Sequence, residues 1–401
     1  MSYETYRVTD LIDEIAMGPF GSNIKVSCFV DSGVPVLNGS NLEGFSLSEK
    51  AFRFVTKEKA DSLNKANAHR GDIVITHRGT LGQIVFIPQD SRYDRYVISQ
   101  SQFRVRCNDK VLPEYLVYYF HTPIGQHKLL SNASQVGVPA LARPSSTFQQ
   151  IEVELPELSI QKRVVEIITT IQKKIENNQE LNDNLQQQAR AIYKEWFIDF
   201  GQTSGTTPAT WKHGKLKDVL QLHKRAIKAG ANTTLPYLPI DTIPMQSFGV
   251  TEFRPNDEAK SSLITFQKDD IIVGAMRVYF HRVVLAPCDG ITRTTCFTLS
   301  PYNSKYLSYA LLTCDLDSSI DHAQNTSKGS TMPYAVWDGG MGEIEIVIPP
   351  IDVAEEFNNI VLPMLRQIQR NCEEIKLLGS LRDTLLPKLM SGEIDVSGIQ
   401  L

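Results

Sequence analysis

Polar and basic side chains gather at turns beside predicted strands in two parts of the sequence. The first set is Lys25, Asn38, Ser40, Asn41, Thr76, Arg78, Gln100, Gln102 and Arg143, and the second is Lys224, Arg225, Lys228, Arg277, Tyr279, Arg293 and Lys328. Arginine hydrogen-bonds well to guanine, and asparagine or glutamine to adenine, whereas lysine more often contacts phosphate. Both sets are therefore candidates for DNA binding. Each residue singly is explained equally well as a solvated loop side chain, so the set is more informative than its members.

Catalytic signatures are absent from the sequence. It contains no Walker A loop, no H-E-x-x-H, no G-x-S-x-G and no Asn-Pro-Pro-aromatic tetrapeptide of the kind found in amino-methyltransferases. The eight histidines and six cysteines are scattered, without metal-ligand spacing or a C-x-x-C pair. We therefore predict a non-catalytic chain that holds neither a metal nor a cofactor of its own.

The composition is typical of a globular protein with more than one domain. The 401 residues are 42% hydrophobic and 21% charged, and no apolar run approaches the length of a membrane span. The N-terminal stretch MSYETYRVTDLIDE does not read as a signal peptide, so we expect a cytoplasmic protein with reduced cysteines. The formal net charge is −4, which by itself does not indicate nucleic-acid binding, although a neutral domain can still carry a basic face.

Two stretches of the chain are nearly alike. IEVELPELSIQKRVVEII at 151–168 and IEIVIPPIDVAEEFNNIV at 344–361 each run from an apolar strand through a proline into an amphipathic helix. The apolar positions that follow have heptad spacing in the same phase. They are Val164, Ile168, Ile171, Ile175, Asn178, Asn182, Leu185, Ile192 and Trp196 in the first stretch, and Phe357, Val361, Met364, Ile368, Asn371, Ile375, Leu378, Leu385 and Leu389 in the second.

We predict that these stretches form two long helices packed against each other. In an antiparallel arrangement Asn182 lies opposite Asn371, and Asn178 faces Ile375. The alternative is that each helix packs on its own half of the chain, but the narrow apolar stripes with polar flanks favour a two-helix seam. Pro363 and Pro387 should kink the second helix or fray its end.

About 150 residues of mixed, β-rich character precede each helix. Runs such as GDIVITHRGTLGQIVFIP and KDDIIVGAMRVYFHRVVLAP are typical of strands joined by turns, and GQTSGTTPAT at 201–210 reads as a linker. The predicted fold is α+β, an internal pseudo-twofold repeat of two β-rich domains and two helices that form an antiparallel coiled coil. The predicted boundaries are 1–156, 157–200, 201–350 and 351–401. A scaffold of this kind suits two different contacts at a defined spacing.

The ends and beginnings of the two helices resemble those of a known family. YKEWFIDF at 193–200, LLPKLMSGEI at 385–394 and PELSIQKRV at 156–164 are similar to conserved segments of the specificity (S) subunits of type I restriction–modification systems. Ala354 stands where the second helix would be expected to carry a glutamine like Gln161. The resemblance spans the chain.

The resemblance implies a division of labour among subunits. Each of two target recognition domains would read one half of a bipartite, asymmetric DNA sequence, and the helices would act as spacers. The helices would also dock two methyltransferase subunits that hold S-adenosylmethionine, which restriction/translocase subunits then join. Trp196 and Phe197 could belong to that docking surface, although core packing explains Trp196 better. The alternative function is a non-catalytic adaptor whose two variable domains bind proteins.

Overall fold

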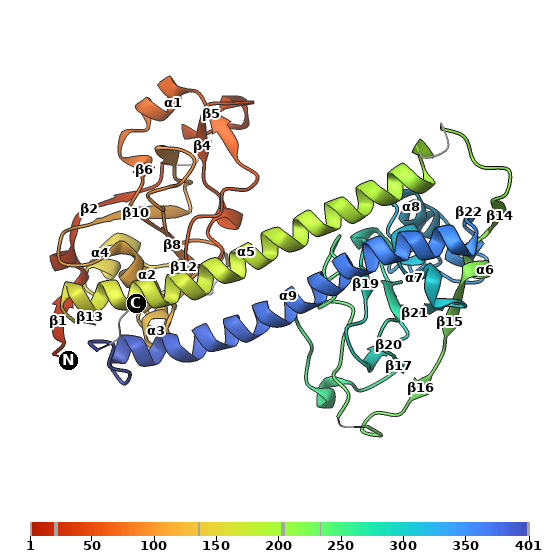
Figure 1. The fold of residues 1–401 in the computed structure, drawn as a ribbon. Helices are drawn as coiled ribbons and strands as arrows, with labels where there is room; N and C mark the ends of the chain where they lie inside the picture. The colour runs from red at the N-terminus through yellow and green to blue at the C-terminus, as the bar shows by residue number, and fades with distance from the viewer. Residues whose placement is uncertain (1, 20–22, 135–136, 202–204, 233, 399–401) are drawn as a thin grey trace. The chain divides into compact units, whose positions relative to one another are not determined.

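The chain divides into two compact units. The computed structural model describes residues 2–19, 23–134, 137–201, 205–232 and 234–398. Unit 1 consists of Met1–Ile171 and Leu381–Leu401, and unit 2 of Gln172–Ser380. The division falls inside the long helices α5 (Leu158–Phe197) and α9 (Ile351–Ser391), so each helix contributes one segment to each unit (Figure 1). The four predicted domain boundaries, which separate the helices from both halves, stay a prediction.

Unit 1 is built around a four-stranded antiparallel sheet. Its order is β2 (Ile12–Met17), β10 (Gln102–Cys107), β7 (Ile73–Thr76) and β8 (Ile84–Phe86). The central strand β7 reads Ile-Val-Ile-Thr and is buried along its whole length. Stiff β-branched side chains favour a strand there, because they fit a pleated surface that is covered on both faces.

A second sheet, two-stranded pairs and short helices complete unit 1. A second sheet runs in the order β3 (Phe29–Val30), β5 (Arg53–Val55), β4 (Val34–Val36), β9 (Arg95–Val97) and β6 (Asn67–His69). Two-stranded pairs join β1 (Glu4–Arg7) to β13 (Glu152–Leu155) and β11 (Ala133–Ser134) to β12 (Ala140–Leu141). The short helices are α1 (Lys57–Ser62), α2 (Pro113–His121), α3 (Pro123–Leu130) and α4 (Pro144–Gln149).

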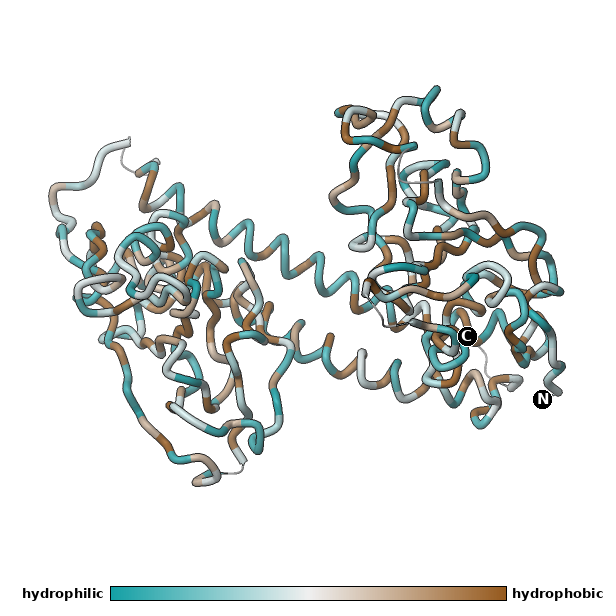
Figure 2. Tube along the Cα trace, turned by 180° about the vertical axis from the view of Figure 1, so that it is seen from behind, coloured by the Kyte–Doolittle hydropathy of each residue, from teal (hydrophilic) through white to brown (hydrophobic). Residues whose placement is uncertain are grey.

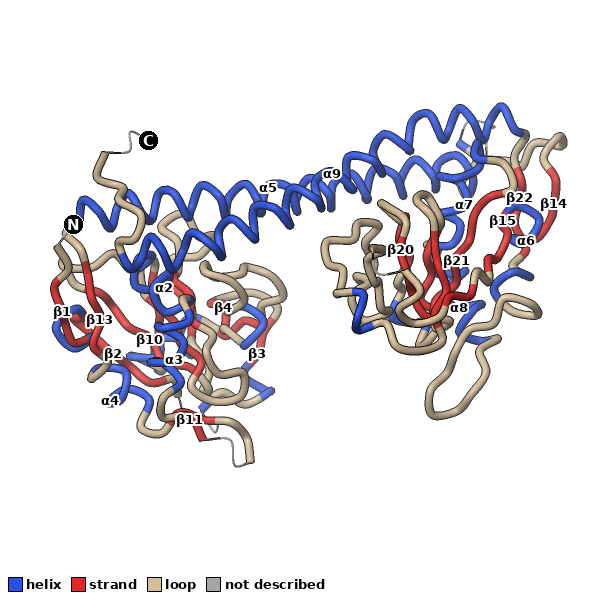
Figure 3. Tube along the Cα trace, turned by 90° about the horizontal axis from the view of Figure 1, so that it is seen from below, coloured by secondary structure: helices blue, strands red, loops and turns tan. Residues whose placement is uncertain are grey.

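Unit 2 repeats this plan with different side chains. Its four-stranded sheet has the order β15 (Leu220–His223), β21 (Cys296–Pro301), β18 (Ile271–Gly274) and β19 (Val283–Leu285). A three-stranded sheet contains β16 (Ala226–Ile227), β17 (Leu263–Phe266) and β20 (Gly290–Arg293), and β14 (Lys212–Lys215) pairs with β22 (Glu345–Ile348). The short helices are α6 (Leu216–Val219), α7 (Leu307–Cys314) and α8 (Asp317–Asn325) (Figure 3).

Alternation along the central strands sends successive side chains into different hydrophobic clusters. In β7, Ile73 and Ile75 join the cluster that contains α2 and the beginning of α5, whereas Val74 packs on the other face with the second sheet. In β18, Ile271 and Val273 pack towards α7 and the long helices, and Ile272 joins a separate cluster. The period of two along a strand places successive side chains on opposite faces, which produces this division.

The two long helices run antiparallel where they meet. In unit 2 the side chains of Asn182 and Asn371 are hydrogen-bonded, and the aromatic rings of Trp196 and Phe357 lie 5.7 Å apart. Hydrophobic residues recur along both helices between hydrophilic ones (Figure 2). The predicted fold class, α+β with two β-rich parts and two long antiparallel helices, is thus confirmed.

The prediction that Pro363 and Pro387 kink the second helix or fray its end stays a prediction, and the structure adds two details. Helix α9 continues through Pro363 and Pro387, so neither proline ends it, because the apolar contacts on both sides outweigh a missing backbone hydrogen bond. Within the described part of the chain, no helix combines the length and the hydropathy that crossing a bilayer requires.

Candidate nucleic-acid interface

The loops that carry most of the first set of candidates meet at one edge of the unit 1 sheet. Strand β7 ends at this edge and β10 begins there, and backbone hydrogen bonds of 2.9 Å from His77 to Ser101 and 2.8 Å from Gly18 to Gln102 join the adjoining loops. The loop between β7 and β8 is tied to residues 139–141 by a 2.9 Å bond from the Gly79 amide to the Pro139 carbonyl. Loops distant in sequence therefore share one surface.

A polar relay joins a further loop to the same edge. The Thr76 hydroxyl donates to Gln83 Oε1 at 3.0 Å, and Gln83 Nε2 donates to the Gly39 carbonyl at 3.0 Å. Gly39 belongs to a short 3-10 helix, Gly39–Asn41, which Asn38 caps by accepting a 2.9 Å bond from the Ser40 amide. The residues around Asn38 are therefore held in a defined conformation beside the β7–β8 loop.

Six of the nine candidates in unit 1 expose their side chains and three do not. The exposed residues are Lys25, Asn38, Ser40, Arg78, Gln100 and Arg143. Asn41, Thr76 and Gln102 are at most 3% exposed. Asn41 donates to the carbonyls of Ser48 and Lys50, and Gln102 Oε1 accepts from the Ser99 amide at 2.8 Å. The prediction that these three read a ligand directly is corrected by their burial: they hold the loops that carry the exposed residues.

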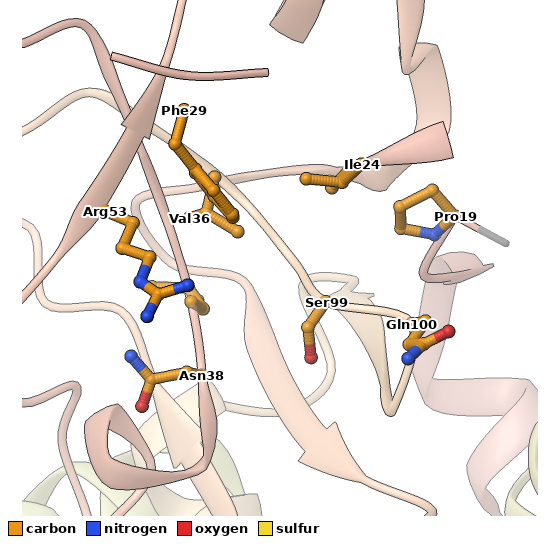
Figure 4. A pocket seen from close by; sticks show the side chains of 9 residues that line it. Pro19, Ile24, Phe29, Val36, Asn38, Arg53, Ser99 and Gln100 are labelled. Atoms are coloured by element: carbon orange, nitrogen blue, oxygen red, sulfur yellow. The ribbon is translucent and has the colours of Figure 1, made fainter. Parts of the chain in front are cut away.

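A hollow of about 340 Å³ opens at this edge. Its apolar lining includes Phe29 and Val36 (Figure 4). Asn38 and Arg53 lie on one side of the hollow, and Ser99 and Gln100 on the other, as Figure 4 shows. Concave sites with an apolar lining and a few convergent polar groups are the usual places for ligand recognition.

Unit 2 builds an equivalent edge with different residues. The backbone amides of Ala275 and Arg277 bond the carbonyls of Thr295 and Pro333 at 2.8 Å, as His77 and Gly79 do at the corresponding positions of unit 1. The correspondence follows the strand register, in which Ile75 pairs with Phe103 and Val273 with Phe297. Arg277 thus stands where unit 1 has a glycine.

Three candidates of the second set lie at this edge. Arg277 is exposed in a left-handed conformation, with φ of 50°, and Tyr279 follows it with 46% of its surface exposed. Lys328 is exposed on a segment that pairs with Tyr334, next to the bridge between Tyr334 and Met276. The turn that contains Arg277 therefore exposes its guanidinium and the ring of Tyr279 on the same loop.

The other four candidates lie elsewhere or are already engaged. Arg225 Nη1 bonds the buried carboxylate of Asp270 at 2.7 Å, at the opposite end of β18 from Arg277. This ion pair compensates a buried carboxylate, so Arg225 supports the fold, and its contact with DNA stays a prediction. Lys224 and Lys228 are exposed beside β16, and the half-buried Arg293 ends β20, where its Nη2 lies 3.4 Å from Ser261.

Arginines of unit 1 differ in whether a carboxylate neutralises them. Arg104 and Arg106 bond Asp72, whose carboxylate is buried, and these pairs support the sheet. Three exposed arginines at or next to the loop edge have no carboxylate partner in the described part of unit 1: Arg53, Arg78 and Arg143. An unpaired guanidinium keeps all its donors available for a guanine or a phosphate.

Arg53 is not among the candidates predicted from the sequence. In the sequence it is one charged residue within AFRFVTK and reads as an ordinary exposed strand position. Its neighbours, Phe29 and Asn38, come from other parts of the chain, so no local pattern could have identified it.

A buried network connects the unit 2 edge to α5. His281 Nε2 lies 3.0 Å from Asp315 Oδ1, and Arg190 of α5 bonds the same carboxylate through Nε at 2.7 Å. The hydrogen bond to Asp315 raises the pKa of His281, against the lowering effect of burial. At the unit 1 edge, burial lowers the pKa of His77. Charge at His281 is thus stabilised by its carboxylate partner.

The thiols and potential metal ligands are placed for packing. Burial raises the pKa of the Cys296 and Cys372 thiols to about 11, which disfavours the nucleophilic thiolate. Across the residues that the structure describes, no three His, Cys, Asp or Glu side chains are grouped so that they could hold a metal ion.

None of the predicted seam residues is exposed. Some pack between the two long helices, and some pack on the globular part of the chain, which are the two arrangements considered from the sequence. Asn371 Nδ2 donates to Asn182 Oδ1 at 2.8 Å, in the register expected of an antiparallel pair. Asn178 Nδ2 donates to Glu374 at 2.8 Å, the residue before the expected neighbour Ile375. Several seam side chains also pack on the globular part of their own unit, so the alternative packing is present as well.

The aromatic residues near the end of α5 lie against the core. Trp196 is half-buried beside Phe357. Phe197 is only 5% exposed, and its ring centroid lies 4.8 Å from that of Phe357. Core packing therefore accounts for both residues better than contact with a partner subunit does.

The known proteins that this chain is similar to are specificity subunits of type I restriction enzymes. Residues 3–187 match the model of the type I restriction modification DNA specificity domain. The chain is 23% identical to the type I restriction enzyme MjaIX specificity subunit of Methanocaldococcus jannaschii, over 96% of this chain and 92% of that one. It is 22% identical to the type I restriction enzyme HindI specificity subunit of Haemophilus influenzae, over 81% and 87%.

A solved structure has a similar fold. The S subunit of a type I restriction–modification system from M. genitalium aligns with 97% of this chain and 96% of its own, with a TM-score of 0.63 and 14% sequence identity. At that identity the likeness supports the fold of the chain.

Proposed function

We propose that the chain is a specificity subunit of a type I restriction–modification system and that it reads a two-part, asymmetric DNA sequence. Each unit would read one part with its loop edge. In unit 1 the exposed residues of that edge include Arg78 and Gln100, and in unit 2 they include Arg277 and Tyr279. Phosphate contacts from lysines such as Lys25 and Lys328 would position the protein on the duplex.

One observation carries this proposal. Backbone bonds at equivalent positions hold the loop edge in both units, as those of His77 and Gly79 in unit 1 and of Ala275 and Arg277 in unit 2, whereas the side chains that the edge presents differ. The structural equivalents of Arg78 and Gly79 are Met276 and Arg277. A common scaffold with unlike exposed donors suits two unlike base sequences, because base identity is read by side-chain donors and acceptors.

The proposed division of labour leaves catalysis to other subunits. Two methyltransferase subunits that hold S-adenosylmethionine would dock on the polar flanks of α5 and α9, and restriction/translocase subunits would join them. The two long helices would also act as the spacer between the half-sites. The chain itself would supply sequence recognition and geometry.

Sequencing of methylated bases tests this function. Cells that express the chain with its cognate methyltransferase should carry methylated adenines in a motif of two defined parts separated by unspecified bases. Cells with the methyltransferase alone should lack that motif. Methylation that does not depend on this chain, or a motif with a single uninterrupted part, would reject the proposal.

Salt dependence separates DNA reading from the adaptor alternative. Binding of the complex to a DNA duplex that contains the motif should weaken steeply as salt rises, because counterions are released when phosphates are neutralised. If the purified complex showed no salt-dependent affinity for any duplex, an adaptor that binds proteins would be the better explanation.

A further inference from the structure

The hollow at the unit 1 edge contains one cation in an unusual setting. The Arg53 guanidinium lies over the Phe29 ring, with its central carbon 5.3 Å from the ring centroid. Arg53 belongs to β5, where it pairs with Val36, and Val36 of β4 in turn pairs with Val97 of β9, two residues before Ser99. The strand pairing therefore brings the guanidinium to the same surface as the loops around Asn38 and Gln100.

Arg53 is ready to bind a ligand, since nothing else uses its donors. No carboxylate and no carbonyl bonds its guanidinium in the part of the chain that the structure describes. Contact with an aromatic face restricts the rotamers of the long side chain, so less entropy is lost when the guanidinium binds. Its exposed donors form a planar fork that matches the O6 and N7 acceptors of guanine.

The other polar groups of the hollow are less complete as base readers. Asn38 Oδ1 already accepts two hydrogen bonds from Ser40, at 2.9 and 2.6 Å, so only its amide donors remain. A bidentate contact with adenine needs both the donor and the acceptor of the amide. Gln100 keeps both groups, but no aromatic ring among the described residues restrains its side chain.

We propose that Arg53 specifies a guanine in the half-site that unit 1 reads, and that Phe29 is the positioning residue that holds its guanidinium. This inference rests on the proposed function. The apolar lining from Val36 and Phe29 excludes water from one side of the contact and strengthens the hydrogen bonds to the base. Arg78 and Arg143 lie farther from the hollow, on the β7–β8 loop and at the start of α4, and they suit phosphate or neighbouring bases.

Base preference in the intact complex tests the assignment. The chain and its cognate methyltransferase are expressed with Arg53→Ala, Arg53→Lys or Phe29→Leu, and the methylated motif is sequenced. Arg53→Ala should make one guanine position of one half-site degenerate, with discrimination against other bases reduced about 5- to 150-fold, the range that one bidentate contact provides. Arg53→Lys should retain affinity but lose most of that discrimination, and Phe29→Leu should lose part of it.

Arg92→Ala is the matched control. Arg92 is also exposed, and its guanidinium lies 5.4 Å from the Tyr93 ring, but it follows β8 at the other end of the sheet and does not line the hollow. This variant should keep the motif of the unaltered complex. The half-site read by unit 2 should also stay intact in every variant, which shows that the complex has folded and assembled.

The outcomes separate the two proposals. An unaltered complex without a two-part motif would reject both the function and the role of Arg53. A two-part motif that Arg53→Ala leaves unchanged would reject the role of Arg53 alone. If methylation is lost in cells, binding of the purified complex to duplexes with each base at each position decides: equal weakening on all of them would mean that Arg53 contacts phosphate, against the proposal.

Discussion

At the scale of single residues, burial and pairing decide which polar side chain can meet a ligand. Asn41 and Arg78 both lie on loops at the unit 1 edge, yet Asn41 is fully buried and bonds two carbonyls. Similarly, Arg225 neutralises the buried Asp270, whereas Arg277 is exposed without a described carboxylate partner. Removing Arg225 would leave a buried charge unpaired, so its substitution would affect stability before it affected recognition.

The His281 network predicts a pH dependence of stability in unit 2. Asp315 and Asp317 face the imidazole at 3.0 and 3.5 Å, and the hydrogen bond to Asp315 raises the pKa of His281 in the folded chain. The stabilisation is therefore complete below the unfolded pKa of about 6.5 and is lost as pH rises through the raised folded value. Urea denaturation should show the unfolding free energy falling across that range.

Two variants isolate this effect. His281→Gln should remove this part of the pH dependence, whereas His213→Gln, at an exposed position, should retain it. His223 contributes with the opposite sign, because burial lowers its pKa, and this contribution is the same in both variants. An identical slope in His281→Gln and the unaltered chain would contradict the role given to His281.

At the scale of elements, the long helices combine a repeated pattern with local differences. At the beginning of α5, the buried Gln161 side chain donates to the Pro156 carbonyl and accepts from the Leu112 amide. Ala354 at the beginning of α9 is also buried, but it has no side chain that could make these bonds. The two helices therefore begin in similar places and are anchored differently.

The paired asparagines predict a non-additive effect on stability. Asn371→Leu removes the donor to the buried Asn182 Oδ1 and should lower the unfolding free energy by about 1–3 kcal/mol. The double variant Asn182→Leu with Asn371→Leu should recover most of this loss, because no buried polar group is left without a partner. Urea midpoints measured by circular dichroism would give both values.

An exposed asparagine of the same helix provides the control for the Asn182–Asn371 pair. Asn177→Leu, at an exposed position of α5, should change the unfolding free energy by less than about 0.5 kcal/mol. Additive losses in the double variant would mean that the two asparagines do not act as a pair.

At the scale of the whole molecule, two units with one plan carry unlike surfaces. Each unit has its own four-stranded sheet, its own hydrophobic clusters and its own loop edge. The β1–β13 pair in unit 1 and the β14–β22 pair in unit 2 each bring the beginning of a half beside the strand that precedes its long helix. This strand pairing is consistent with the prediction that the two halves act as separate modules.

An exchange of halves tests that modularity. Replacing residues 1–150 by the corresponding segment of another specificity subunit should change one part of the methylated motif and leave the other part and the gap unchanged. Sequencing of methylated bases would measure all three. A change in both parts would show that recognition is not divided between the halves.

The overall fold was accessible from the sequence, whereas the details of the interface were only partly so. The heptad phase and the repeated strand–proline–helix motif are local patterns, and they identified two long helices, the two β-rich halves and the Asn182–Asn371 pair. Most loop candidates of unit 1 lie together at one edge, but Lys224 and Lys228 lie beside β16, away from Arg277. The position of a residue in the sequence does not show whether its side chain lies at the loop edge or away from it.

The sequence by itself determined the elements, because hydrophobic periodicity depends on neighbours within a few residues. Only the tertiary structure decided the partners of each polar group. Arg225 meets Asp270 across 45 positions, and Arg53 meets Phe29 because β3 and β5 pair. Whether an arginine is neutralised or free depends on strand register and on long-range packing, and neither is encoded in the residues next to it.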